Sequence, residues 1–140
     1  MFVLDTDHAT SCQQGNVALE MHLSLLSPGE LATTIVTYEE QVTGRLAVIR
    51  CAKTLPQRQR AFFWLGRTLD FFCRIPVLQF DERAANTYQR LTVLKLRIGT
   101  QDLLIASIAL ANQATLLTRN LRDYRQVPGL ELQDWTTPLV

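Results

Sequence analysis

The chain has 140 residues, 47% of them hydrophobic and 19% charged, which fits one domain over residues 1–140 and excludes a disordered or membrane-spanning protein. Its formal net charge is only +1, but residues 1–44 hold six acids and no Lys or Arg, whereas residues 45–97 hold eleven bases and three acids. Because no basic segment leads into an apolar run at the start, we expect no secretory signal and a cytoplasmic location.

The N-terminal third predicts two strands separated by a helix. Residues 2–4 are an apolar run, which predicts a buried strand followed by a loop at residues 5–7. Residues 16–26 are rich in leucine and long enough for a helix, which the Pro-Gly pair after it ends. Residues 31–36 are rich in β-branched side chains and predict the second strand.

Two long helices are predicted next. Thr37, with Glu40 three residues later, fits a capping box, so the first helix is expected to begin there and to run to about residue 52. The second begins at Pro56 and extends toward Arg74. Its aromatic side chains are more typical of a core or a partner surface than of a platform for stacking bases.

The C-terminal half continues the alternation of strands and helices. Asp81 is expected to cap a helix that Gly99 ends. The next helix, from Thr100 or Gln101, is apolar on nearly all sides and is therefore predicted to be buried. The other predicted elements are strands at residues 75–80, 115–118 and 130–132 and one short helical turn at residues 120–124.

This order of elements predicts an α/β fold with a central parallel sheet of four to five strands and helices on both faces. In such a sheet, functional groups gather beyond the carboxyl ends of the strands. Asp5 ends the first predicted strand, Glu40 lies at the start of the helix after the second, Asp102 opens the buried helix, and Asn120 follows the fourth strand. We therefore expect these four side chains to lie close together.

Three neighbouring carboxylates repel one another and favour a bound divalent cation. Because the ligands on offer are oxygens, Mg²⁺ or Mn²⁺ is the expected metal. The three cysteines are widely spaced, without a C-x-x-C pair, and the two histidines, His8 and His22, have no cysteine or serine at a suggestive spacing, which argues against zinc. Such a site would activate water and neutralise charge on a phosphodiester.

Each of these residues also has a purely structural interpretation. Glu40 could serve only as the capping partner of Thr37, and Asp102 could serve only the dipole of its helix. Asn120 could cap the short turn that follows it. Asp7 is either a turn residue or a supporting ligand, and Asp81 is more typical of a helix cap than of a metal ligand. The common location of the acids, rather than any one of them, carries the hypothesis.

Segments along the whole chain also match the motifs of one protein family, in the family's order. The most specific match contains Asp102 and runs from residue 98 to residue 106. The others are Val3-Leu4-Asp5-Thr6-Asp7, Thr37-Tyr38-Glu39-Glu40 with Gly44, Phe80-Asp81 with Ala84-Ala85, and Leu117-Thr118-Arg119-Asn120 with Tyr124, Val127-Pro128-Gly129-Leu130 and Trp135. With these motifs the chain resembles the PIN-domain ribonucleases, and within them the VapC-type toxins of type II toxin–antitoxin pairs.

The resemblance implies a PIN-like three-layer fold and Mg²⁺- or Mn²⁺-dependent cleavage of a structured RNA such as tRNA. Asp5, Glu40 and Asp102 would be the catalytic and metal-binding residues. Thr6, Asp7, Thr118 and Asn120 would support them. The family also implies a homodimer and a small cognate antitoxin, which would dock on the two helices between Thr37 and Arg74.

Two residues depart from the family pattern. Asn120 stands where many members have Asp, which weakens the case for a second metal ion. Tyr124 replaces the usual Phe, a change that we expect to be harmless.

Two alternative functions remain open from the sequence. A PIN fold that binds RNA or protein with weak or no catalysis is compatible with Asn120 and the modest charge. A haloacid-dehalogenase-type phosphatase would use Asp5-Thr6-Asp7 as its nucleophile loop, but the residues that follow do not fit, and a phosphoryl group trapped on Asp5 would identify it. The RNA target, the antitoxin, and whether the chain is a toxin or a housekeeping nuclease are not evident from the sequence.

Overall fold

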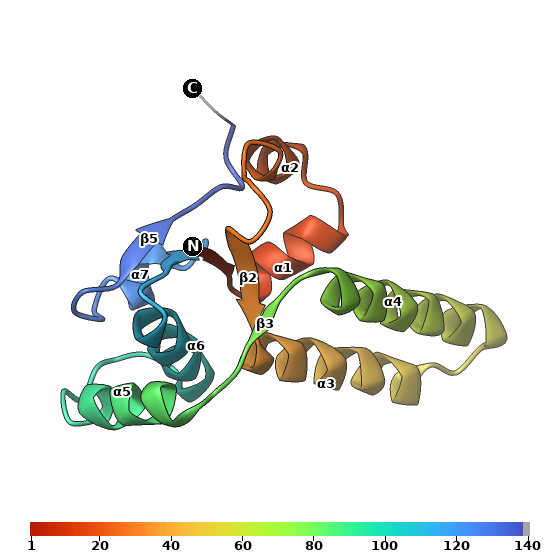
Figure 1. Cartoon of the computed structure of the whole chain (residues 1–140). Coiled ribbons are helices and arrows are strands. Elements are labelled where there is room, and N and C mark those ends of the chain that lie inside the picture. Colours follow the sequence, from red (N-terminus) through yellow and green to blue (C-terminus); the bar gives the residue numbers. More distant parts are fainter. Residues whose placement is uncertain (139–140) are drawn as a thin grey trace.

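The computed structural model describes residues 1–138 of the chain. Within these residues, short strands and longer helices alternate as the sequence predicts (Figure 1). The elements are β1 (Phe2–Leu4), α1 (Thr6–Gln13), α2 (Val17–Leu23), β2 (Leu31–Thr34), α3 (Ile35–Cys51), α4 (Leu55–Arg74), β3 (Val77–Leu78), α5 (Glu82–Thr92), α6 (Thr100–Ala111), β4 (Thr115–Leu117), α7 (Leu121–Tyr124) and β5 (Glu131–Gln133).

The strands form one five-stranded sheet in the order β3-β2-β1-β4-β5, and every neighbouring pair is parallel. β1 lies at the centre, where Phe2 pairs with Leu31 on one side and with Thr115 on the other. The predicted fold class is confirmed. Because all strands run in the same direction, the segments that follow β1, β2 and β4 leave the sheet at the same edge.

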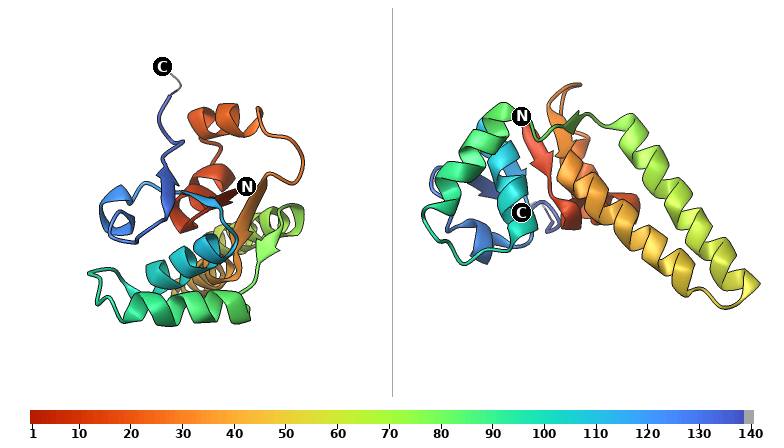
Figure 2. Two further views of the ribbon diagram at one scale, coloured as in Figure 1. Left: turned by 60° about the vertical axis from the view of Figure 1, so that its left-hand side comes forward. Right: turned by 90° about the horizontal axis from the view of Figure 1, so that it is seen from below.

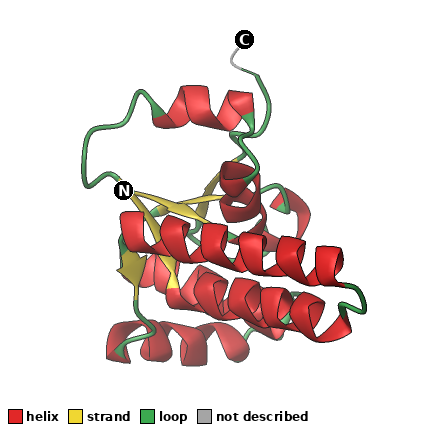
Figure 3. Cartoon of the chain, turned by 90° about the vertical axis from the view of Figure 1, so that its right-hand side faces the viewer, coloured by secondary structure: helices red, strands yellow, loops and turns green. Residues whose placement is uncertain are grey.

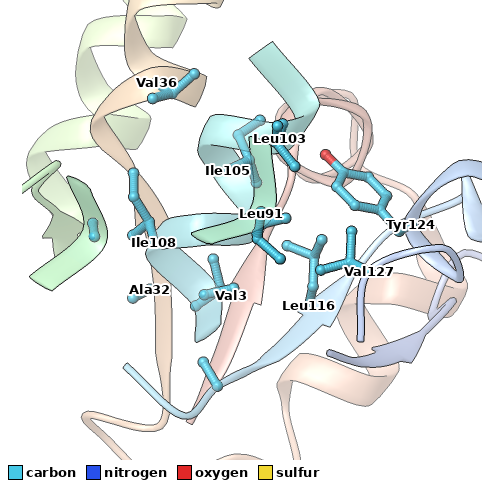
Figure 4. Close-up of a cluster of buried hydrophobic side chains, with 14 residues drawn as sticks. Val3, Ala32, Val36, Leu91, Leu103, Ile105, Ile108, Leu116, Tyr124 and Val127 are labelled. Carbon is cyan, nitrogen blue, oxygen red and sulfur yellow. The ribbon is translucent and has the colours of Figure 1, made fainter. Parts of the chain in front are cut away.

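Successive side chains of the strands supply the two hydrophobic cores on opposite faces of the sheet. Val3 and Leu116 pack against α5 and α6, whereas Leu4 and Leu117 pack against α1 and α2. All four are fully buried. Figure 4 shows the first of these cores, with the ring of Tyr124 at its margin. This arrangement gives three layers, with the sheet between two layers of helices (Figure 2).

Helices α3 and α4 lie side by side and project from the sheet as a long hairpin, called the arm below (Figures 1 and 3). The cap of α4 is Thr54, which forms a capping box with Gln57. The helix is strongly amphipathic, and several of its large apolar side chains remain exposed, among them Leu55, Phe62 and Phe63. None of the helices in residues 1–138 has the length and apolar character needed to span a bilayer.

Several details of the predicted elements are wrong. Residues 6–13 form a helix, where only a loop at residues 5–7 is predicted. The cap of α3 is Thr34, whose hydroxyl accepts a hydrogen bond from the Thr37 backbone N–H (3.0 Å), so the last two residues of the strand predicted at 31–36 belong to α3. The strand expected at residues 75–80 contains only Val77 and Leu78. Finally, α5 ends at Thr92, and Gly99 is the N-cap of α6 rather than the end of α5.

Candidate active site

Asp5 is the first residue beyond β1 and the N-cap of α1. Asp5 is 4% exposed, and its Oδ1 accepts a hydrogen bond from the backbone N–H of His8 (2.9 Å). This bond caps the helix and leaves Oδ2 without a hydrogen bond within residues 1–138. A buried carboxylate of this kind has a structural role and still offers an oxygen to a ligand.

Glu40 is not a capping residue, because Thr34 rather than Thr37 caps α3. Its Oε1 instead accepts a hydrogen bond from the Thr6 hydroxyl (2.8 Å), so the start of α1 is joined to α3. Burial raises the pKa of Glu40, and the nearby charges of Asp102, Glu39 and Asp5 raise it further, while the bond from Thr6 opposes the rise. The structure thus removes the capping interpretation of Glu40 and brings it into the field of the other acids.

Asp102 lies in the first turn of α6. The Tyr124 hydroxyl donates a hydrogen bond to its Oδ1 (3.1 Å). Burial raises the pKa of Asp102, as do the charges of Asp5, Asp123 and Asp7, and the Tyr124 bond opposes the rise. In turn, burial and the charge of Asp102 raise the pKa of Tyr124, so this phenol stays protonated as a donor. Tyr124 therefore gives Asp102 a hydrogen bond that a Phe at this position could not supply.

Asn120 and Thr118 form the part of the site that follows β4. The Asn120 side-chain amide lies 3.4 Å from Oδ2 of Asp102 and 3.1 Å from Asp123. Its backbone N–H donates to the Thr118 hydroxyl (2.9 Å). Asn120 makes no side-chain capping bond to α7, so the capping interpretation is wrong. Its amide faces carboxylates instead.

Asp7 is an exposed member of the same group. Burial of its carboxylate and the charge of Asp5 raise its pKa, while Arg119 and His8 lower it. Arg119 is exposed and lies on the segment between Thr118 and Asn120, so a cation stands at the rim of the acidic cluster. Asp81, in contrast, caps α5 by accepting from the Ala84 N–H (3.0 Å), as the sequence predicts.

The chemistry and charge of this donor set fit a hard divalent cation. Asp5, Glu40 and Asp102 influence one another electrostatically. Within residues 1–138, none of the three pairs with a Lys or Arg. Their free donors are oxygens, which Mg²⁺ and Mn²⁺ prefer. The same residues contain no group of three His, Cys, Asp or Glu side chains already spaced to hold a metal ion. Binding would therefore require these side chains to turn toward the ion.

A series of hydrogen-bonded polar side chains begins at Gln41, the residue after Glu40. Gln41, next to Glu40, donates to the Thr6 carbonyl oxygen (3.2 Å) and accepts from the Gln13 amide. The Thr68 hydroxyl of α4 donates to Gln13 (3.0 Å), and Arg45 Nε donates to Thr68 (3.1 Å). This set of bonds, called the polar relay below, joins the arm to α1.

Two contributors to the site lacked a recognisable signal in the sequence. The Tyr124 hydroxyl reaches Asp102 across 22 residues of chain. His8 is fully buried beside Asp5, and its partner Trp135 lies 127 residues away. Only the helix spacing of Asp5 and His8 could have indicated this pair, and that requires α1, which the polar composition of residues 6–13 conceals.

Comparison with known proteins gives several relatives, although no family model matches the chain. Ribonuclease VapC1 of Haemophilus influenzae (strain R2866) is 28% identical over 97% of this chain and 98% of its own length. Ribonuclease VapC2 of Rickettsia felis is 39% identical, and the tRNA(fMet)-specific endonuclease VapC of Salmonella typhimurium is 33% identical, each over 69 residues. Those two matches cover 46% of this chain and 52% of each relative, so they span about half the length of both proteins.

Solved structures agree with this result over the whole chain. A chain of VapBC-1 from nontypeable Haemophilus influenzae superposes with a TM-score of 0.72 at 27% identity, covering 97% of this chain and 98% of that one. The parallel sheet and the projecting arm accompany this full-length likeness. The chain is thus similar over nearly its whole length to VapC-type ribonucleases, the family that its motifs resemble.

Proposed function

We propose that the chain is a metal-dependent endoribonuclease and the toxin of a type II toxin–antitoxin pair. The observation that carries the proposal is that Asp5, Glu40 and Asp102 follow separate elements at the same edge of the parallel sheet, where Thr6, Asn120 and Tyr124 hydrogen-bond to Glu40 and Asp102. The charge of Asp5 raises the pKa values of the other two acids. The ribonuclease names of its relatives support the reaction class. A cytoplasmic location would place the enzyme beside its RNA.

In the proposed mechanism, Asp5, Glu40 and Asp102 would hold one Mg²⁺ or Mn²⁺. When bound, the ion would lower the pKa of a water molecule and neutralise charge on the scissile phosphate. Thr6 orients Glu40, and Tyr124 orients Asp102, each through one hydrogen bond. Arg119 at the rim supplies a positive charge for the RNA backbone. Asn120 replaces a charged ligand by a neutral amide, which favours a single ion.

The test is cleavage of RNA by the purified chain with Mg²⁺ or Mn²⁺ and in EDTA. We expect Asp5→Asn, Asp102→Asn and Glu40→Gln to abolish cleavage in chains that remain folded by circular dichroism. Glu39→Gln is the matched control, because Glu39 is the exposed neighbour of Glu40 and should be dispensable. Cleavage that persists in the first three variants would refute the assignment. A phosphoryl group trapped on Asp5 would favour the phosphatase alternative.

The Salmonella relative is named for its action on tRNA(fMet), and we propose a structured RNA of the tRNA class as the substrate. Digestion of total RNA followed by mapping of the cut ends would test this. Discrete cuts in tRNA are expected. Uniform degradation of single-stranded RNA would contradict the substrate class but not the nuclease activity.

The arm is the proposed docking site of the antitoxin. A groove of about 450 Å³ between α3 and α4 is lined by apolar residues and by Arg45, Arg60 and Trp64. The Arg45 guanidinium lies 5.2 Å from the centre of the Trp64 ring. Such a groove suits an apolar peptide that carries carboxylates. Trp64→Ala should weaken binding of the protein encoded beside this gene, and Phe80→Ala, outside the arm, should not.

A homodimer is also part of the proposal. Four large apolar side chains of α4 are each more than half exposed: Leu55, Phe62, Phe63 and Leu69. None of them lines the groove between α3 and α4, so an antitoxin in that groove would leave them for a second copy of the chain. Light scattering of the purified chain should give twice the mass of 15.9 kDa. A monomer at all concentrations would contradict the dimer.

A second candidate is an RNA- or protein-binding module without catalysis. Asn120 and the absence of a ready-made metal site within residues 1–138 favour it. It predicts RNA binding that EDTA leaves unchanged and no cleavage with either metal. Cleavage that requires Mg²⁺ or Mn²⁺ would exclude it.

A further inference from the structure

His8 is a fully buried histidine of α1 whose role is not explained by packing alone. Its backbone N–H donates the capping hydrogen bond to the Asp5 carboxylate. Its imidazole lies between that carboxylate and the C-terminal segment. The ring atom Nε2 accepts a hydrogen bond from the Trp135 backbone N–H (3.1 Å). The other ring nitrogen, Nδ1, has no hydrogen-bond partner within residues 1–138 and lies 3.6 Å from Oδ1 of Asp5.

The bond from Trp135 determines which ring nitrogen carries the proton. A backbone N–H is always a donor, so Nε2, which faces it, must hold a lone pair. The neutral imidazole therefore carries its proton on Nδ1. Asp134 Oδ1 lies 3.5 Å from Nε2, but it already accepts two hydrogen bonds from Thr136. A proton on Nε2 would also point at the Trp135 hydrogen.

The Nδ1 proton then has the Asp5 carboxylate 3.6 Å away as a candidate acceptor. A buried donor without a partner is costly, and the distance of 3.6 Å is within a few tenths of an ångström of hydrogen-bond range. We propose that His8 is a positioning residue, which donates through Nδ1 to Asp5 and fixes the carboxylate so that Oδ2 faces the active site. The proposal rests on the proposed function for the role of Asp5.

The same argument excludes His8 as a metal ligand. Coordination through Nδ1 would require both ring nitrogens to lack a proton, because Nε2 already accepts from Trp135. His8 therefore acts on the ion only through Asp5. The C-terminal segment takes part as well, because it sets the tautomer of the ring from 127 residues away.

The first test determines the tautomer in the full chain without metal, by long-range ¹H–¹⁵N correlation spectra at neutral pH. The chain has two histidines, so His22→Gln assigns the signals of His8. We expect a protonated Nδ1 and an unprotonated Nε2 for His8. A protonated Nε2 would overturn the proposal. This result does not depend on metal or on activity.

The second test separates the two ring nitrogens by substitution. Asn places an amide donor near the position of Nδ1 and loses the acceptor for Trp135, whereas Gln places an acceptor near Nε2 and loses the donor for Asp5. We expect His8→Gln to weaken Mn²⁺ binding, measured by isothermal titration, about tenfold, as removal of an outer-shell partner does. His8→Asn should bind Mn²⁺ nearly as well as the unaltered chain despite a lower melting temperature.

Equal weakening by the two substitutions, or none in His8→Gln, would overturn the proposal, because a purely structural histidine would not distinguish them. An unaltered chain that binds no Mn²⁺ would refute the metal site of the proposed function. In that case the tautomer measured in the first test still shows whether His8 Nδ1 can donate to Asp5. Failure of the metal site is thereby distinguished from failure of the His8 proposal.

Discussion

Tyr124→Phe removes one hydroxyl group and retains the buried ring beside Leu103 and Val127 (Figure 4). The lost interaction is the hydrogen bond to Asp102 (3.1 Å). A hydrogen bond to a charged group contributes about 1.5–3 kcal/mol, and we expect a net loss of roughly 1 kcal/mol here because Asp102 is half-buried and water replaces the hydroxyl. For a chain of this size that corresponds to a fall of about 3–4 °C in melting temperature.

The pH dependence tests the cause of this loss. The hydroxyl opposes the rise in the pKa of Asp102 that burial produces, so the stability from this bond is present where Asp102 is ionised and is lost as pH falls through that pKa. Urea denaturation at pH 7 should show the full difference between the variant and the unaltered chain, and at pH 3 a smaller one. Tyr38→Phe is the control, because its hydroxyl forms no hydrogen bond within residues 1–138. Equal differences at both pH values would refute the reasoning.

Three further substitutions test the site and the fold. Glu40→Gln should raise the urea midpoint of unfolding at pH 7 in EDTA. Because the pKa of Glu40 is raised in the folded chain, protonated Glu40 stabilises the fold fully below the ordinary value of 4.5, and this stability is lost as the pH rises through the raised value. Gln stays neutral at every pH and avoids that loss. An unchanged midpoint would contradict this. Asp81→Ala should cost about 1 kcal/mol through loss of the α5 cap and leave RNA cleavage unchanged; a loss of cleavage would argue that it belongs to the site. Leu116→Ala should cost about 2–5 kcal/mol in the same denaturation assay, because this side chain is fully buried on β4, between β1 and β5; a cost below 1 kcal/mol would contradict its place in the core.

The sheet could be predicted from the sequence because its strands are short apolar runs that helices separate. α1 could not, because residues 6–13 are mostly polar and have no apolar periodicity. The predicted start of α3 is three residues too late, because Thr34 and Thr37 are both residues that can cap a helix. The choice between them depends on where β2 leaves the sheet, which is a tertiary property.

The candidate site divides in the same way. Asp5, Glu40 and Asp102 could be found because each follows or opens a predicted element at the same edge of the sheet. The groups that orient them could not, because Tyr124 and His8 act through contacts between distant parts of the chain. The sequence identifies the acidic residues, but the hydrogen bonds that orient their carboxylates depend on the tertiary structure.

The polar relay from Arg45 to Gln41 has a consequence for the arm. Arg45 borders the groove, and Gln41 is adjacent to Glu40. Three hydrogen bonds connect Arg45 to Gln41 through Thr68 and Gln13, and a fourth joins Gln41 to the Thr6 carbonyl oxygen of α1. Separating the base of the arm from α1 would therefore break these hydrogen bonds, and that from Gln41 to the Thr10 hydroxyl, and would expose the buried amides of Gln13 and Gln41. We therefore expect the root of the arm to move together with α1 rather than independently of it.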